Sequence, residues 1–172
     1  TVNGVTQRPF LEPAFSPKLL RIAYDRERGT AAVTSRLSIL KANGRPATGL
    51  TNSARAWNPS EPEEKPVDSK GRVLAFDPDG FDSESMVRDA AGRFWIGEEY
   101  GPSLLKVAAN GRIEKRWSPG KGGLPEFLKR RQNNRGFEAM TWNSEGHLLL
   151  FLQSSLPALS KNAASTHLIP VL

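Results

Sequence analysis

Two adjacent carboxylates, Glu98 and Glu99, end the run "FWIGEEY", whose other residues favour a β-strand. The run breaks directly afterwards at Gly101-Pro102. Paired carboxylates at a strand end can act as a general acid and base, or can bind a hard cation through their oxygens. The doublet is therefore the first candidate site in this chain.

More carboxylates gather just upstream, in the stretch "DPDGFDSE" that ends with Asp82 and Glu84. Its density of acids resembles a calcium loop, but the glycine and the last glutamate do not have EF-hand spacing. Clustered oxygen ligands would still favour calcium over softer metals. Acids in a surface loop more often face solvent than bind metal, and both interpretations stay open at this point.

The sequence repeats itself around the doublet. "ESMVRDAAGRFWIGEE" from Glu84 aligns without a gap on "EAMTWNSEGHLLLFLQ" from Glu138. The matched positions share one constant offset: Glu84 with Glu138, Met86 with Met140, and Gly92 with Gly146. Three matches of different chemical type at one offset predict a structural repeat. Glu99 aligns with Gln153, so the doublet belongs to one repeat only.

Four short strands are predicted from residue 84 onwards, and turn residues separate them. The strands are "ESMVRD", "FWIGEEY", "SLLKVAA" and "IEKRW", and Asn110-Gly111 is the strongest hairpin signal. Four antiparallel strands in about 35 residues form the unit of a β-propeller. We therefore predict an all-β chain that forms part of a β-propeller, with about two to three four-stranded blades.

These patterns divide the chain into parts of one incomplete propeller domain. They are the outer strands of a first blade (1–50), a long polar, Pro-rich loop (51–80), a complete four-stranded blade (81–118), an insertion loop (119–137) and the start of the next blade (138–172). A closed ring has about four to eight blades. We expect the remaining part of the propeller on a missing segment or on another chain.

Glu84 and Glu138 each open the first strand of a blade, and that strand lines the channel of a propeller. Carboxylates that share one cavity repel each other, which raises a pKa or recruits a cation. Each glutamate could instead accept backbone N–H bonds at its strand start. Tyr100, as a hydrogen-bond donor, and Arg135, as a charged fork, suit an anionic substrate, although core packing is the favoured role for a lone tyrosine at a strand end.

Composition excludes several other classes of protein. A chain of 172 residues with 38% hydrophobic and 24% charged residues fits one folded domain, and its 15 glycines and 13 prolines favour turns. The absence of cysteine excludes disulfides, thiolate metal sites and a cysteine nucleophile. There is no HExxH or GxSxG motif, and the longest apolar run, Leu148 to Leu152, is too short to span a membrane.

The net charge of +6 would attract polyanions, but it is scattered along the chain. The one dense basic cluster is Lys129, Arg130, Arg131 and Arg135, and no aromatic residues are spaced through it as stacking platforms. A solvated face is the favoured interpretation of this cluster, and a nucleic-acid site is the less favoured one.

Two long stretches carry a family resemblance. "FDPDGFDSESMVRDAAGRFWIGEEYGPSLLKVAANGRI" and "LPEFLKRRQNNRGFEAMTWNSEGHLLLFLQSSL" resemble the phytase-like domain family, known as "esterase-like activity of phytase". The shared marks are an Asp-x-Glu pair, a Trp-x-x-Glu-Glu-Tyr-Gly-Pro-Ser run, an Asn-Arg-Gly-Phe-Glu run and a Gln-Ser-x-Leu ending. With "GRPATGLTN" upstream, the resemblance covers about residues 18 to 157.

The resemblance implies a bacterial, periplasmic or secreted β-propeller whose signal peptide is not in the chain, with phosphoesterase activity attributed to recurrent acids. The positions of this chain that match the recurrent residues in the family's motifs are Asp82, Glu84, Glu98, Glu99, Tyr100, Arg135 and Glu138. Ser83, Ser85 and Ala139 depart from the Pro and Gly residues usual at those places, which affects the turn geometry more than the carboxylates.

The resulting prediction is a calcium-assisted hydrolase of small anionic phosphomonoesters or phosphodiesters. Its predicted metal ligands are Asp82, Glu84, Glu98, Glu99 and Glu138. Its predicted catalytic residues are Glu98, Glu99, Glu138 and Arg135, with Tyr100 and Arg135 binding substrate. The alternative is a non-catalytic propeller that binds a ligand or a partner protein.

Overall fold

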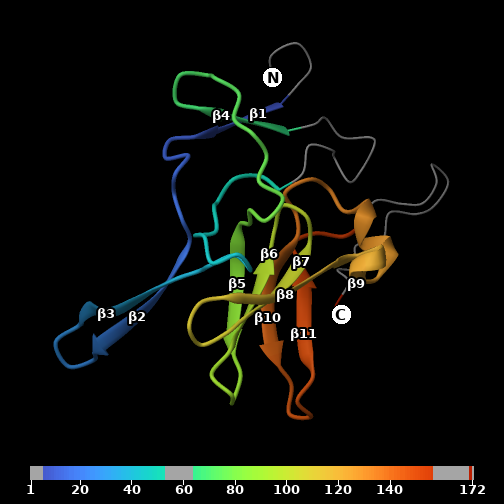
Figure 1. The fold of residues 1–172 in the computed structure, drawn as a ribbon. Helices are drawn as coiled ribbons and strands as arrows, with labels where there is room; N and C mark the ends of the chain where they lie inside the picture. The colour runs from blue at the N-terminus through green and yellow to red at the C-terminus, as the bar shows by residue number, and fades with distance from the viewer. Residues whose placement is uncertain (1–5, 53–63, 157–170, 172) are drawn as a thin grey trace.

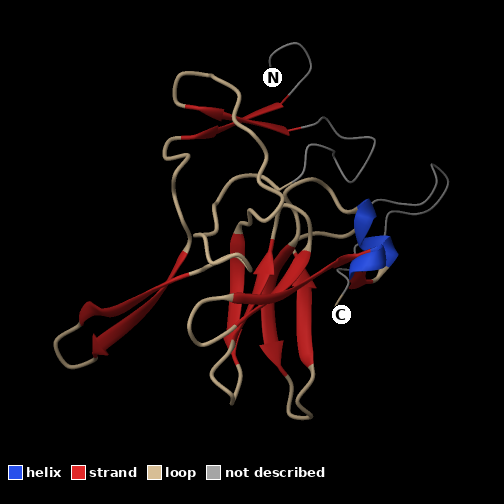
Figure 2. Cartoon of the chain, viewed as in Figure 1, coloured by secondary structure: helices blue, strands red, loops and turns tan. Residues whose placement is uncertain are grey.

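The chain folds as strands joined by turns (Figures 1 and 2). A computed structural model describes residues 6–52, 64–156 and 171, and it contains two 3-10 helices and no α-helix among these residues. The elements are β1 (Thr6–Phe10), β2 (Lys18–Asp25), β3 (Thr30–Ser38), β4 (Glu64–Asp68), β5 (Ser83–Arg88), β6 (Phe94–Glu98), β7 (Ser103–Val107), β8 (Ile113–Pro119), η1 (Gly120–Gly122), β9 (Gly123–Leu124), η2 (Glu126–Arg130), β10 (Phe137–Trp142) and β11 (Leu148–Leu152). The predicted all-β class is confirmed.

A five-stranded sheet in the order β5-β6-β7-β8-β9 forms the centre of the molecule. Strands β5 to β8 pair antiparallel as neighbours, and they match the four strands predicted between residues 81 and 118. The two-residue β9 adds a short parallel pair beside β8. The predicted insertion loop 119–137 therefore holds a fifth strand and both 3-10 helices.

One five-residue turn recurs in the described chain, at 41–45, 68–72, 89–93, 108–112 and 143–147. In each turn the first N–H donates to the fifth carbonyl, and the glycine at the fourth position donates back to the first carbonyl. These glycines adopt a positive φ, for example +81° at Gly92 and +87° at Gly111, which other residues adopt at a cost. Glycine at this position therefore sets the register of the adjoining strands.

The strand registers show that the predicted repeat is present in the fold. Ser83 pairs with Glu98 and Ser85 with Gly97, so Glu84 lies in a β-bulge. At the equivalent place in the second repeat, Phe137 pairs with Leu152 and Ala139 with Phe151, so Glu138 also lies in a bulge. A bulge leaves one residue without a partner and redirects its side chain. Both repeated glutamates therefore occupy the same special backbone position.

The central sheet packs on both of its faces. One face buries Ile96, Leu105 and Val107 against Ile39, Ala47 and Phe81. The opposite face lies against the β10–β11 pair, where Leu104 joins Phe137, Leu150 and Leu152 (Figure 1). A Cβ on Gly97 would lie 3.0 Å from the Cβ of Phe137, so glycine allows this close approach of β6 to β10. The sheet is thus enclosed between an earlier and a later part of the chain.

Two strand pairs lie outside this core. β2 and β3 form a long antiparallel hairpin that projects from the body, within the stretch 1–50 where outer strands of a blade were predicted (Figure 1). β1 pairs in parallel with β4, which lies within the stretch 51–80 predicted as a loop. That prediction was wrong for residues 64–68, because their partner strand is distant in sequence and no local pattern reveals it.

The sequence also predicted part of a propeller ring and a further blade that begins at residue 138. The described strands form four separate sheets and close no ring among themselves. Val171 makes a single antiparallel bridge to Phe151, and residues 157–170 and 172 of the predicted next blade lie outside the described residues. No helix in the described part of the chain is long and apolar enough to cross a membrane.

Candidate functional site

Three carboxylates converge where β5 begins and β6 ends. Asp82, Glu84 and Glu99 each place a carboxylate oxygen within 4.8 Å of the others. Antiparallel pairing brings the start of β5 beside the end of β6, and the Glu99 N–H donates to the Asp82 carbonyl at 3.0 Å. The bulge at Glu84 provides the third member. We refer to Asp82, Glu84 and Glu99 as the acidic cluster.

Glu138 from the second repeat lies beside the acidic cluster. Burial raises the pKa of Glu99 to about 8, and the negative charges of Asp82, Glu138 and Glu84 add to this shift. Glu99 also shares a side-chain hydrogen bond with Glu138. Burial and the charges of Asp82 and Glu138 also raise the pKa of Glu84. The four acids thus destabilise one another as anions, which is the condition that a bound cation relieves. Their oxygen donors fit a hard cation such as calcium.

Glu98 has a different environment from its neighbour Glu99. Its side chain is fully buried, and its two oxygens accept hydrogen bonds from the N–H groups of Asp82, Tyr100 and Gly101 and from the Ser103 hydroxyl. Burial raises its pKa, although the charge of Arg116 and the bonds from Ser103 and Gly101 oppose the shift. The prediction of Glu98 as a metal ligand does not fit this geometry, because both oxygens already hold the turn between β6 and β7.

The "NRGFE" run contributes to the site through a glycine. A Cβ on Gly136 would lie 2.5 Å from the carbonyl oxygen of Glu98 and 2.6 Å from the Cα of Glu99. The Gly136 carbonyl also accepts the Gln153 N–H at 3.0 Å, the counterpart of the bond between Glu99 and Asp82 in the other repeat. Gly136 therefore lets the second repeat approach the backbone of the doublet and brings Glu138 to the acidic cluster.

Arg8 forms an ion pair with the acidic cluster, and the sequence did not point to it. Its Nη1 lies 3.7 Å from an Asp82 oxygen, its Nε lies 3.3 Å from Glu64, and its guanidinium lies 4.9 Å from the centre of the Tyr100 ring. Arg8 reaches the site because β1 pairs with β4 at the edge of the core. No local motif surrounds it, so only the tertiary structure reveals its position.

The two residues predicted to contact substrate differ in their surroundings. The Tyr100 hydroxyl donates to the Gly49 carbonyl at 2.9 Å, and burial raises the pKa of the phenol. Arg135 has an exposed side chain, and no ion pair joins it to the acidic cluster in the part of the chain that the structure describes. The structure therefore brings together Asp82, Glu84, Glu99, Glu138 and Tyr100, but not Arg135.

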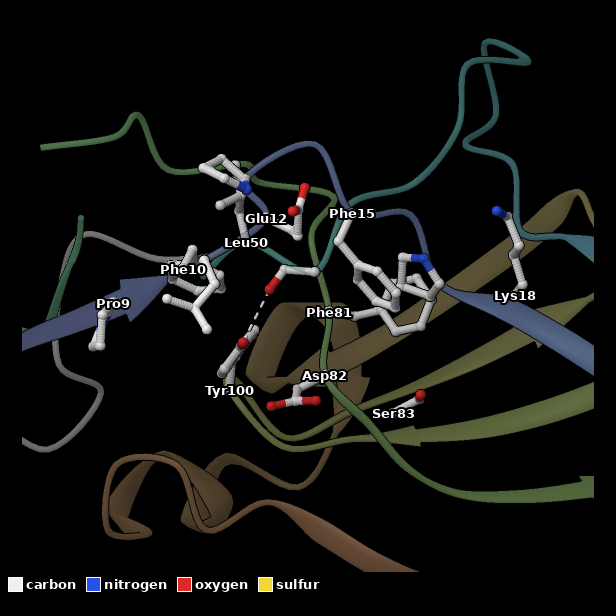
Figure 3. Close-up of a pocket in the computed structure, with 14 residues that line it drawn as sticks. Pro9, Phe10, Glu12, Phe15, Lys18, Leu50, Phe81, Asp82, Ser83 and Tyr100 are labelled. Carbon is white, nitrogen blue, oxygen red and sulfur yellow. Dashed lines mark hydrogen bonds between the residues drawn. The ribbon is translucent and has the colours of Figure 1, made fainter. Parts of the chain in front are cut away.

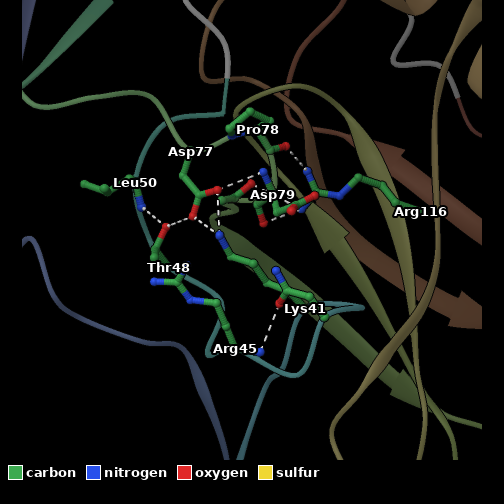
Figure 4. Close-up of polar contacts among 10 residues, drawn as sticks. Lys41, Arg45, Thr48, Leu50, Asp77, Pro78, Asp79 and Arg116 are labelled. Atoms are coloured by element: carbon green, nitrogen blue, oxygen red, sulfur yellow. Dashed lines mark hydrogen bonds and ion pairs between the residues drawn. The ribbon is translucent and has the colours of Figure 1, made fainter.

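The first half of "DPDGFDSE" anchors the loop that carries Asp82 (Figure 4). Lys41 Nζ and Thr48 Oγ1 each lie 2.6 Å from an oxygen of Asp77. Burial opposes ionisation here, but the bonds from Lys41 and Thr48 lower the pKa of Asp77 overall. Arg116 donates to three successive carbonyls, from Pro78 to Gly80, at 3.1 to 3.3 Å. The acids of this stretch thus divide into an anchoring part and a part in the cluster.

The basic cluster does not form one solvated face. Arg131 is only 1% exposed and donates to the Gln132 carbonyl at 2.6 Å. Lys129 pairs with Glu126 at 2.6 Å within η2. The interpretation as a solvated face was therefore wrong for Arg131. The same burial removes Arg131 from any continuous basic surface for nucleic acid.

An open pocket of about 390 Å³ adjoins the acidic cluster (Figure 3). Asp82 and Ser83 form part of its wall, together with Tyr100 and apolar side chains from the segment that connects β1 to β2. The acidic cluster is therefore not an isolated surface patch, because a cavity large enough for a small organic group lies directly beside it.

An all-β fold with clustered carboxylates at a strand edge defines a class of proteins that can hold a hard cation beside a small-molecule pocket. A family model described as "Phytase-like: Esterase-like activity of phytase" matches residues 12–171. The chain therefore belongs to the phytase-like family, as the sequence motifs predicted. Family membership indicates a hydrolase of the phosphoester type that acts on a small anionic phosphoester.

No curated protein matches the chain, and no solved structure matches it.

Proposed function

We propose that this protein is a calcium-assisted phosphoester hydrolase whose metal site is the acidic cluster with Glu138 beside it. The convergence of Asp82, Glu84 and Glu99 to within 4.8 Å carries the proposal. Three carboxylates at this separation give a hard cation several oxygen ligands, while repelling one another without it. Membership of the phytase-like family supports a phosphoester as the substrate.

A calcium ion at this site would neutralise phosphate charge and lower the pKa of a bound water. The protein's own residues supply the surroundings. Glu98 holds the turn that presents Glu99, and Gly136 holds the second repeat against it. Arg8 lies beside Asp82, where a guanidinium can bind phosphate oxygens through two parallel N–H groups. The predicted roles of Glu138 as a catalytic acid or base and of Arg135 as a second phosphate contact remain part of the proposal.

We also propose that the described sheets are blades of a β-propeller. The sequence repeat, its matching bulges and the packing of the central sheet between two other parts of the chain support this architecture. Location in the periplasm or outside the cell is a further proposal, and it rests on the family resemblance alone.

The test measures release of 4-nitrophenol from 4-nitrophenyl phosphate and from bis(4-nitrophenyl) phosphate, with calcium and with EDTA. Activity should require calcium, and Asp82→Asn or Glu99→Gln should lower kcat/KM by at least about 100-fold. Glu145→Gln is the matched control, because Glu145 is 73% exposed and lies in the turn before β11. Activity that is indifferent to EDTA and to both variants would exclude this site.

A non-catalytic binding protein is the second candidate. The Tyr100 hydroxyl and both Glu98 oxygens are already occupied by bonds within the protein, which leaves fewer free catalytic groups than the motifs predicted. This candidate predicts saturable calcium binding at the acidic cluster with no release of 4-nitrophenol from either ester.

A further inference from the structure

We propose that the pocket beside Asp82 binds the alcohol part of the substrate, and that the enzyme prefers phosphoesters of apolar alcohols to polyphosphorylated cyclitols such as phytate. This inference rests on the proposed function, because it assigns the substrate class of the same site. The pocket of about 390 Å³ is large enough for one aromatic or short aliphatic group.

The pocket wall combines polar groups with an apolar part that can receive an apolar group. Five side chains in it are large and apolar: Phe10, Leu11, Phe15, Leu50 and Phe81. Three prolines add further apolar surface and have no backbone N–H to donate: Pro9, Pro13 and Pro17. The Tyr100 hydroxyl at the base is directed to the Gly49 carbonyl, the bond drawn as a dashed line in Figure 3. The Tyr100 hydroxyl is therefore not free to donate to a ligand in the pocket.

The charge of the wall does not favour a polyanion. Among the described residues that line the pocket, Lys18 is basic and Glu12 is acidic, while Asp82 is a proposed calcium ligand. A ligand with several phosphates would therefore find no excess of positive charge in the wall once one phosphate had been placed at the acidic cluster. An alcohol without further charge needs no such positive charge.

The pocket and the acidic cluster are continuous through Asp82, which belongs to both. Because the phosphate and the alcohol of an ester are joined by one bond, a phosphate at the acidic cluster places its alcohol within reach of this pocket. Burial of an apolar group there should improve kcat/KM by about tenfold or more, since the free energy gained grows with the apolar area removed from water.

The test compares 3-phenylpropyl phosphate with propyl phosphate, whose alkyl alcohols are leaving groups of similar acidity. We expect kcat/KM to be at least about tenfold higher for the phenyl compound in the presence of calcium. Phytate should be hydrolysed more slowly than either compound. Equal values for the two alkyl esters, or a preference for phytate, would overturn the inference while leaving the proposed function intact.

Phe15→Ala tests the pocket wall directly. Phe15 is 59% exposed, so its removal should not disturb the core, and the preference for the phenyl compound should fall about fivefold. Tyr24→Ala on the β2–β3 hairpin is the matched control, because Tyr24 is an aromatic residue of similar exposure, 66%, away from the pocket. A preference that survives Phe15→Ala unchanged would count against the pocket.

Absence of turnover of all three esters would instead contradict the proposed function. Calorimetric titration with 3-phenylpropyl phosphate in the presence of calcium would then test whether the pocket binds an apolar group. Weaker binding in Phe15→Ala than in Tyr24→Ala would support an apolar binding site. Equal binding in the two variants would overturn it.

Discussion

At the scale of single residues, the two adjacent glutamates illustrate how neighbours in sequence can have separate roles. Successive side chains at a strand end point in opposite directions. Glu98 points into the protein and accepts four hydrogen bonds, whereas Glu99 points towards Asp82, Glu84 and Glu138. One carboxylate therefore stabilises the turn, and the other contributes to the proposed metal site.

Because the two glutamates have different roles, replacing each by glutamine should affect a different property: folding stability for Glu98 and calcium binding for Glu99. Glu98→Gln replaces an accepting oxygen with a donor that faces N–H groups, so it should lower the free energy of unfolding by about 2 kcal/mol in urea without metal. Glu99→Gln should cost far less stability but should weaken calcium binding, measured by calorimetry, by at least about tenfold. Unchanged calcium binding in a folded Glu99→Gln protein would contradict this division.

The raised pKa of Glu99 predicts how stability depends on pH. The pKa rises from 4.5 to about 8, so between these values the folded protein holds a proton that the unfolded chain has released. The contribution of Glu99 to stability without metal should therefore be fully present below pH 4.5 and should be lost as the pH rises towards 8. Thermal denaturation in EDTA measures this slope, and Glu99→Gln should flatten it.

Calcium should reverse that dependence on pH. A cation binds the ionised carboxylates and displaces the proton, so the stabilisation by calcium should grow as the pH rises through the same interval. A calcium effect that is independent of pH, or that is equally large in Glu99→Gln, would place the ion elsewhere.

At the scale of elements, backbone geometry assembles the site. Two bulges at equivalent places redirect Glu84 and Glu138, and Gly136 allows the second repeat to touch the backbone of Glu98 and Glu99. The recurring Gly turns set the strand registers that align these features. The side chains alone would not converge without this arrangement.

Gly136→Ala should therefore be more damaging than an ordinary glycine substitution. Its Cβ would meet backbone atoms of Glu98 and Glu99 at 2.5 to 2.6 Å, which side-chain rotation cannot relieve, and we expect a loss of about 3 kcal/mol in urea unfolding. Gly29→Ala is the control, since Gly29 has open space around it and a φ of +62°, so only backbone strain of about 1 kcal/mol applies. Equal losses in the two variants would argue against tight contact at Gly136.

At the scale of the whole molecule, the β2–β3 hairpin leaves apolar side chains in solvent. Leu20, Ile22 and Tyr24 alternate along one face of β2 and are 51%, 57% and 66% exposed. A two-stranded hairpin has marginal stability by itself, and in the described residues β2 and β3 pair only with each other. Such a surface with unpaired edges favours association with other strands.

The purified chain should therefore self-associate through this hairpin. Ile22→Lys with Tyr24→Lys should lower the average mass measured by light scattering at high protein concentration, while the free energy of unfolding changes by only about 0.5 kcal/mol. Ala23→Lys adds a charge to the opposite face of the same strand and should have a smaller effect. A chain that stays monomeric at all concentrations would contradict this expectation.

The sequence by itself determined the features that depend on neighbours along the chain. Alternating side chains and Gly turns specified β5 to β8, and the constant offset of the repeat predicted the second glutamate, Glu138, at the equivalent place. The motifs also identified the phytase-like family correctly. These features are local because hydrogen bonding in turns and hairpins joins residues only a few positions apart.

The tertiary structure alone decided which candidate residues lie together. It separated Glu98 from the acidic cluster, buried Arg131, left Arg135 exposed, and placed Arg8 beside Asp82 through the parallel pairing of β1 with β4. Each of these outcomes depends on contacts between distant segments, where burial and charge act through space. A pattern of neighbouring residues contains no signal for them.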